Sequence, residues 1–196
     1  MCQHPNWPRK CTKWLWTWGL KKGRMKRNGG FSLIELLIVV AIILIIAAVA
    51  IPNLLRAKIA ANEASAASAI RTINTAEFAY NAAFPSNGYA AALSDLGGVS
   101  PCVPTVTAAC LIDNVLATAI PGSVGKSGYV FAATGVVPNG AQYLSFVSAA
   151  APVTYNRTGV RDFCSTEDGV IRYKPGTPGG VPVTTQAACR AYFVME

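Results

Sequence analysis

The sequence predicts an α+β fold in which a long N-terminal α-helix packs on a small antiparallel β-sheet. Two observations predict it. A helical pattern without Gly, apolar in its first half except for Glu35, runs from Ser32 to Phe84. Short β-like runs separated by turn residues follow it in residues 85–196. At 196 residues, the chain has room for one domain of ordinary size with its own core.

Residues 1–30 are strongly basic. They contain eight of the 17 Lys and Arg residues and none of the nine Asp and Glu residues, so residues 31–196 carry nine of each and no net charge. This balance excludes the basic surface that a nucleic-acid-binding protein needs, and no nucleic-acid site is evident. The segment also holds His4, the only histidine, and all four tryptophans. We interpret residues 1–30 as a cytoplasmic leader peptide, with Met25 as an alternative start of translation.

The next segment is apolar enough to cross a membrane. Nineteen residues, Leu33 to Ile51, are interrupted only by Glu35. At 1.5 Å per residue they form a helix of about 28 Å, close to the hydrocarbon thickness of a bilayer. The basic cluster before them predicts that the N-terminus stays in the cytoplasm and that the chain after Ile51 lies outside. Residues 31–52 are therefore the expected transmembrane part of the helix.

Residues 53–84 continue the helix as an amphipathic half. Apolar residues recur at mostly three-, four- and seven-residue spacing, with polar residues expected around them. The stripe consists of Leu55, Ile59, Ala66, Ile70, Ile73, Tyr80 and Phe84, and the polar residues are Arg56, Lys58, Asn62, Glu63, Arg71 and Asn74. Pro85 and Gly88 end the pattern.

Residues 85–196 form the expected globular domain, which begins with a loop. One brief helix is predicted around Leu111–Ala119. Four strands are then predicted, at Tyr129–Ala133, Tyr143–Ala149, Phe163–Ser165 and Val170–Tyr173. The first pair is joined by the turn residues Pro138-Asn139-Gly140 and the second by Glu167-Asp168-Gly169.

The junction GGFSLIELLIVVAIILIIAAVAIP resembles the processing site and first helix of type IV pilins and of the pseudopilins of type II secretion. The resemblance is close over residues 26–58 and implies the pilin fold. It also implies that a membrane-embedded prepilin peptidase cuts after Gly30 and methylates the new amine of Phe31. Gly30 suits a protease cleft because it has no side chain. Alone, Gly29-Gly30 would be only a flexible break before a helix.

Glu35 is the single carboxylate in the apolar segment. A carboxylate without a partner in lipid costs several kcal/mol, and no Lys or Arg lies between Phe31 and Arg56. We therefore expect Glu35 to pair with the free amine of Phe31 on a neighbouring subunit and to set the axial register of assembly. The alternative is a Glu near the helix start that the helix dipole favours. Pro52 removes a hydrogen bond to the Ala48 carbonyl and allows a kink, or is simply tolerated at the membrane boundary.

Four cysteines, Cys102, Cys110, Cys164 and Cys189, lie in a region expected outside the cytoplasm, where disulfides form. Three pairings are possible. We favour Cys102–Cys110 and Cys164–Cys189, the second because pilins often close a C-terminal loop in this way. A zinc site is disfavoured, since there is no C-x-x-C pair and no nearby His. Residues 166–169 have too few carboxylates for a clear calcium site, and no cofactor is expected.

The function expected from the resemblance is structural. The chain would be a pilus subunit, used in adhesion or motility, that waits in the inner membrane and then assembles with copies of itself and other pilins through an inner-membrane assembly platform. A pseudopilin of a periplasmic secretion filament is the alternative. Without a His after residue 30, a Ser-His-Asp or Cys-His arrangement is excluded in the mature chain, so no enzyme is predicted. A secreted domain cut at Ala48-Val49-Ala50 is the remote alternative.

Overall fold

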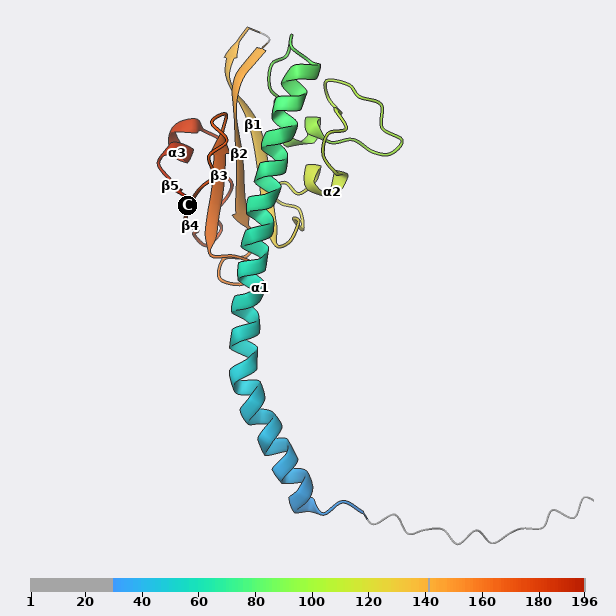
Figure 1. Ribbon diagram of the computed structural model, residues 1–196, viewed down its shortest axis with the longest axis vertical. Helices are drawn as coiled ribbons and strands as arrows, with labels where there is room; N and C mark the ends of the chain where they lie inside the picture. Colours follow the sequence, from blue (N-terminus) through green and yellow to red (C-terminus); the bar gives the residue numbers. More distant parts are fainter. Residues whose placement is uncertain (1–29, 141, 196) are drawn as a thin grey trace, which may run out of the picture. The chain divides into compact units, whose positions relative to one another are not determined.

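The computed structural model describes residues 30–140 and 142–195 (Figure 1). The expected leader and Met25 therefore lie outside the described residues. The chain divides into two units, Met1–Ile43 and Leu44–Glu196. The β-sheet and the hydrophobic core both belong to the second unit.

Helix α1 spans Leu33–Ala83, within one residue of the predicted limits at both ends. It begins where the Ser32 carbonyl accepts hydrogen bonds from the backbone nitrogens of Glu35 and Leu36, at 3.1 and 3.2 Å. Its 51 residues contain no Gly and one Pro. They are rich in Ala and Leu, which have high helix propensity, and in Ile, whose propensity is somewhat lower. After α1, Gly88 takes a φ of 76° and donates to the Phe84 carbonyl, which turns the chain back toward the sheet.

Five antiparallel strands follow in the order β1-β2-β3-β4-β5. Their bounds are Tyr129–Asn139, Gln142–Pro152, Arg161–Thr166, Arg172–Pro175 and Phe193–Val194. Each strand pairs with its neighbour in sequence, so the sheet is a simple meander. The predicted α+β fold, with a long helix packed on a small antiparallel sheet, is thereby confirmed.

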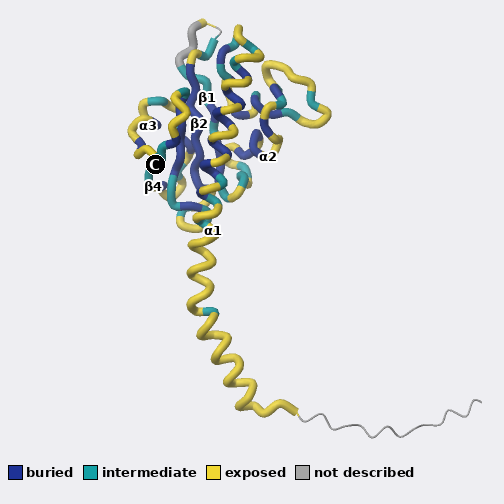
Figure 2. Tube along the Cα trace, in the orientation of Figure 1, coloured by how far each residue is buried: buried dark blue, intermediate teal, exposed yellow. Residues whose placement is uncertain are grey.

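The core lies between one face of α1 and the sheet (Figure 2). Ile70, Ile73 and Tyr80 of α1 are at most 2% exposed and belong to the same cluster as Phe131 and Phe163 of the sheet. Burying an aliphatic or aromatic side chain of this size stabilises the fold by roughly 1.5–3 kcal/mol. The predicted stripe is thus correct from Ala66 onward, whereas Leu55, nearer the N-terminus, is exposed because no strand covers it.

Two polar residues of α1 differ from the sequence prediction. Glu63 and Asn74 were expected among the polar residues around the apolar stripe, but both are buried against the sheet. Each has polar partners there, Arg161 for Glu63 and Ser165 for Asn74, so burial leaves their hydrogen bonds satisfied.

Several short elements lie outside the main helix and sheet. Helix α2, Asn114–Ala117, falls inside the predicted 111–119 segment and is capped by Asp113, whose side chain accepts from the Leu116 nitrogen. A 3₁₀ turn at Leu93–Leu96, helix α3 at Gln186–Arg190 and strand β5 were not predicted. β1 also continues six residues beyond its predicted end at Ala133, because it pairs with β2 as far as Asn139.

Candidate functional site

The predicted processing junction is accessible. Gly30, Phe31 and Ser32 precede α1 without regular secondary structure, and all three are exposed. Phe31 is 82% exposed. A Cβ added at Gly30 would meet no heavy atom within 4 Å, so the described structure leaves room for another protein around this bond. The junction can therefore present an extended, uncovered backbone to a protease.

Glu35 lies in the first turn of α1 and is exposed. Within residues 30–140 and 142–195, no ion pair to Glu35 is present. In the unprocessed chain the Phe31 nitrogen is part of a peptide bond, so the expected amine exists only after cleavage. The position also suits an acidic residue at the positive end of the helix dipole.

The first half of α1 presents apolar side chains all round. Along Leu33–Ile51 only Ala47 is even half-buried, and every other residue is exposed (Figure 2). Among the described helices, α1 alone is long and apolar enough to cross a membrane, and none of its most apolar 18 residues is buried. Pro52 follows this surface directly and lies inside the helix, which continues on both sides of it.

Comparison with known proteins agrees with these features. The protein family described as "Prokaryotic N-terminal methylation motif" matches residues 25–51, which include the junction, Glu35 and the whole apolar surface Leu33–Ile51. A 39-residue stretch is 64% identical to the type IV wide pilus major component PilA4 of Thermus thermophilus. That stretch covers 20% of this chain and 30% of the relative, so the likeness spans less than a third of that protein. No solved structure matches the chain.

Residues 25–51 carry the N-terminal methylation motif, and part of the chain is similar to a type IV pilin. The name of the relative describes a structural component of a pilus. The described part of the motif, residues 30–51, lies at the start of α1, whereas both disulfides lie in the sheet domain.

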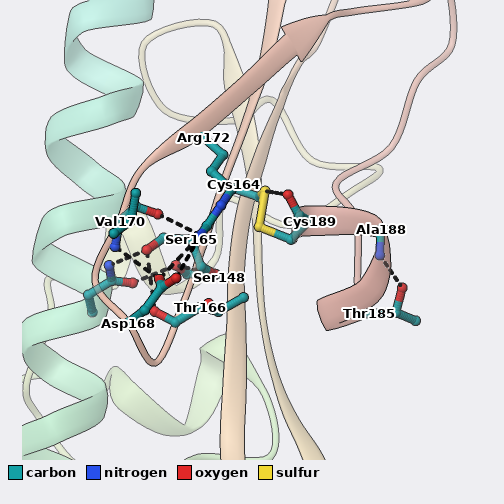
Figure 3. The surroundings of a disulfide bond; sticks show 11 residues. Ser148, Cys164, Ser165, Thr166, Asp168, Val170, Arg172, Thr185, Ala188 and Cys189 are labelled. Atoms are coloured by element: carbon teal, nitrogen blue, oxygen red, sulfur yellow. Dashed lines mark hydrogen bonds and ion pairs between the residues drawn. A yellow bond between two sulfur atoms is a disulfide. The ribbon is translucent and has the colours of Figure 1, made fainter. Parts of the chain in front are cut away.

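The sheet domain contains two disulfides, Cys102–Cys110 and Cys164–Cys189. They are the pairs favoured from the sequence. The second joins β3 to α3, and both its cysteines are fully buried beside Val147 and Ala149 of β2 (Figure 3). It therefore fastens the C-terminal segment to the middle of the sheet.

The Cys102–Cys110 disulfide closes the loop after the 3₁₀ turn. The Cα atoms are 6.1 Å apart, and Gly98 packs directly against the bridge. A Cβ at Gly98 would lie 2.0 Å from Cys102 Sγ, so only Gly fits there. This close approach could not be read from the sequence, because it depends on how the loop folds back.

The two carboxylates of the segment considered for calcium, residues 166–169, are both paired with arginines. Asp168 pairs with Arg172 at 2.5 Å, and this hydrogen-bonded contact lowers the Asp168 pKa to about 2 (Figure 3). Glu167 accepts from Arg190 at 2.9 Å and from Gln186 at 2.5 Å. No group of three metal-ligating side chains occurs among the described residues. Both carboxylates thus serve the fold of the C-terminal segment.

Sequence reasoning missed the ion pair that joins α1 to the start of β3. Arg161 donates to Glu63, and its guanidinium also lies over the rings of Phe163 and Tyr173, at 5.7 and 5.4 Å from their centroids. An isolated Glu in a helical pattern gave no sign of its partner, which lies 98 residues away.

Proposed function

We propose that the chain is the structural subunit of a type IV pilus filament. The observation that carries the proposal is the exposed apolar surface of Leu33–Ile51, placed directly after an accessible Gly30–Phe31 bond. A surface of that size needs cover, because large contiguous apolar patches are rare on soluble monomers. A bilayer supplies the cover before assembly, and neighbouring helices supply it afterwards.

The proposed sequence of events uses the residues of the motif in turn. A prepilin peptidase in the inner membrane cuts after Gly30 and methylates the amine of Phe31. The span then holds the subunit in the membrane, with the sheet domain outside. An assembly platform moves the span out of the bilayer, and lipid contacts are replaced by contacts between helices, so little apolar burial is lost.

We propose that Glu35 sets the axial register between neighbouring subunits. In the apolar interior of a filament, its carboxylate meets the amine of Phe31 on the adjacent subunit, and misaligned subunits would leave both charges unpaired. An unpaired buried charge is strongly disfavoured, so the pair selects one axial offset. Pro52 supports the same process by leaving the Ala48 carbonyl free, which eases bending where the span meets the sheet domain.

The likeness to a pilus major component favours a surface pilus over a pseudopilus, although it covers only 30% of that relative. In both cases the partners are copies of the chain and other pilins, the peptidase and the assembly platform. The same helix would build a short periplasmic filament if the chain serves protein secretion.

The experiment has two steps. N-terminal sequencing of the mature protein is expected to give methylated Phe31, whereas a start at Ile51 would indicate a secreted domain and contradict the proposal. Cells are then labelled with an antibody to residues 85–196 and imaged. Long labelled surface fibres, together with lost motility and intact protein export after gene deletion, support a pilus. Lost export without such fibres indicates a pseudopilus.

A further inference from the structure

A basic pocket lies where α1 meets the turn between β2 and β3. Its volume is about 480 Å³, and it belongs wholly to the unit Leu44–Glu196. In Figure 1 this turn lies beside α1 at one end of the sheet. The lining residues are Leu55, Lys58, Ile59, Thr154, Asn156, Arg157 and Thr158.

The turn that supplies Arg157 is held firmly against α1. Asn62 of α1 donates from Nδ2 to the Thr158 carbonyl at 2.9 Å. Asn156 takes a φ of 62°, and its backbone nitrogen donates to the Gly159 carbonyl at 2.9 Å, which closes the turn. Gly159 packs on the Tyr129 ring so closely that a Cβ would lie 2.0 Å from the phenolic oxygen. These contacts hold the turn that carries Arg157 against α1, so that Arg157 lines the same pocket as Lys58 without help from a ligand.

The pocket carries two positive charges and no acidic residue. Lys58 and Arg157 are both exposed, and neither forms an ion pair within the part of the chain that the structure describes. The nearest carboxylate on α1, that of Glu63, is already bound to Arg161 and to the Val160 nitrogen. Two cations on different elements, with Thr and Asn residues lining the same pocket, suit an anion with several acceptor oxygens, such as a phosphate.

The depth of the pocket identifies the source of that phosphate. Lys58 lies seven residues after Ile51, which at 1.5 Å per residue is about 10 Å beyond the end of the apolar span. The headgroup layer adds roughly 5–8 Å on each side of the hydrocarbon core, and the long side chain of Lys can reach back into it. Leu55 and Ile59, on the same wall, offer apolar contact to the glycerol and the first acyl carbons.

We propose that this pocket binds the phosphate of an anionic phospholipid in the outer leaflet while the subunit is held in the membrane. The inference rests on the proposed function only in that Leu33–Ile51 must span the bilayer. Binding there would fix the depth and rotation of the subunit before assembly, because both cations line a single pocket beside α1. Release of the lipid would accompany extraction of the subunit.

Lipid retention tests the proposal directly. The mature full-length protein is reconstituted into vesicles of equal parts phosphatidylglycerol and phosphatidylcholine, extracted in mild detergent and examined by native mass spectrometry. The wild type is expected to retain phosphatidylglycerol about tenfold over phosphatidylcholine, given two basic groups at the headgroup level. Equal retention of the two lipids would overturn the proposal.

The matched comparison uses two variants of equal charge. Lys58→Gln/Arg157→Gln removes the pocket's cations and is expected to abolish the preference. Arg71→Gln/Arg190→Gln removes two exposed cations elsewhere, on α1 and on α3, and is expected to keep it. If both variants lose the preference for phosphatidylglycerol, the preference reflects overall charge, and the pocket is not a specific lipid site.

Two further measurements distinguish a lipid from the other possible ligands of this pocket, which are free phosphate and an acidic group of a second copy. If inorganic phosphate binds the detergent-solubilised protein while phosphatidylglycerol is not retained, the lipid assignment is wrong. If Lys58→Gln/Arg157→Gln blocks filaments yet leaves lipid retention unchanged, the pocket serves an acidic group of a second copy instead. Extraction of the chain by alkaline carbonate would contradict the membrane span, and so the proposed function, rather than the lipid site alone.

Discussion

Glu63 of α1 and Arg161 of β3 form a two-point ion pair, with Glu63 Oε2 at 2.8 Å from Arg161 Nε and 2.6 Å from Nη2. The other carboxylate oxygen accepts from the Val160 nitrogen at 3.0 Å. The Glu63 side chain is only 5% exposed, although that of Arg161 is 41% exposed. This pair is the contact at which α1, after its exposed first half, becomes fixed to the sheet.

Glu63→Ala should therefore destabilise the sheet domain. The change leaves the Val160 nitrogen and the guanidinium without an acceptor, and hydrogen bonds to charged groups contribute about 1.5–3 kcal/mol. Since Arg161 can turn partly toward water, we expect the free energy of unfolding to fall by about 2 kcal/mol in denaturant titrations followed by circular dichroism. Glu167→Ala, at a partly exposed pair with Arg190, should change it by less than about 1 kcal/mol. Equal effects of the two variants would contradict this role for Glu63.

Asn74 forms a second polar contact between α1 and the sheet, in the middle of the core. Its Nδ2 donates to Ser165 Oγ at 2.8 Å, and its Oδ1 accepts from Ser148 Oγ at 2.5 Å. Asn74→Ala leaves both buried hydroxyls short of a partner and should lower the free energy of unfolding by about 2–3 kcal/mol.

The matched variant removes the whole polar set at this contact. Asn74→Leu/Ser148→Ala/Ser165→Ala leaves no orphaned hydroxyl, so it should be more stable than Asn74→Ala alone when both are melted under the same conditions. A triple variant that unfolds more easily than the single one would show that Asn74 acts through packing rather than through its hydrogen bonds.

The sequence predicts the features that depend on local pattern and misses those that depend on distant partners. Helix α1 and the two hairpins follow from residue spacing and turn residues, because these signals lie within a few positions of one another. The burial of Glu63 and Asn74 does not, since their partners lie 98 and 91 residues away. Strand β5 has two residues and exists only through its pairing with β4, which no periodicity can report.

The burial of Glu77 should make the free energy of unfolding depend on pH. The side chain is fully buried on α1, and this burial raises its pKa to about 8. The hydrogen bond that the Ala90 nitrogen donates to Glu77 Oε2 lowers the pKa, whereas the nearby Asp95 carboxylate raises it further. Because the folded pKa exceeds the unfolded value of about 4.5, the folded state holds the extra proton between these pH values. Its contribution to stability is full below pH 4.5, falls as the pH rises and is lost by about pH 8.

Glu77→Gln should remove this dependence. A neutral amide can still accept from the Ala90 nitrogen, so the variant is expected to match the wild type near pH 4 and to exceed it increasingly toward pH 8. Asp95 and Tyr80, which also face this region, are unchanged in the comparison. Thermal melts of both proteins across this range measure the difference, and parallel curves would show that Glu77 does not carry the proton.

The two disulfides should contribute unequally. Chain entropy gives about 3.5 kcal/mol for Cys164–Cys189, with a separation of 25 residues, and about 2.5 kcal/mol for Cys102–Cys110, with a separation of eight. The first pair is also fully buried, so Ser hydroxyls there would need new partners. In denaturant titrations, Cys164→Ser/Cys189→Ser should therefore lose more stability than Cys102→Ser/Cys110→Ser. The reverse order would mean that the loop bridge, not the C-terminal one, holds the domain together.

Glu35→Ala tests the role proposed for the only carboxylate in the apolar segment. Alanine is well tolerated in a membrane helix, and the Gly30–Phe31 bond is untouched, so insertion and cleavage should remain near wild-type levels by carbonate extraction and N-terminal sequencing. Filament yield in sheared cell fractions should fall to background, because the amine of Phe31 would lose its partner in an apolar surrounding. Glu35→Asp keeps the charge on a shorter side chain and should retain part of the yield, whereas Glu35→Gln, similar in shape but neutral, should behave like Glu35→Ala. Wild-type filament yield from Glu35→Gln would show that the side chain needs no charge, and the Glu35 position would then serve only the start of α1.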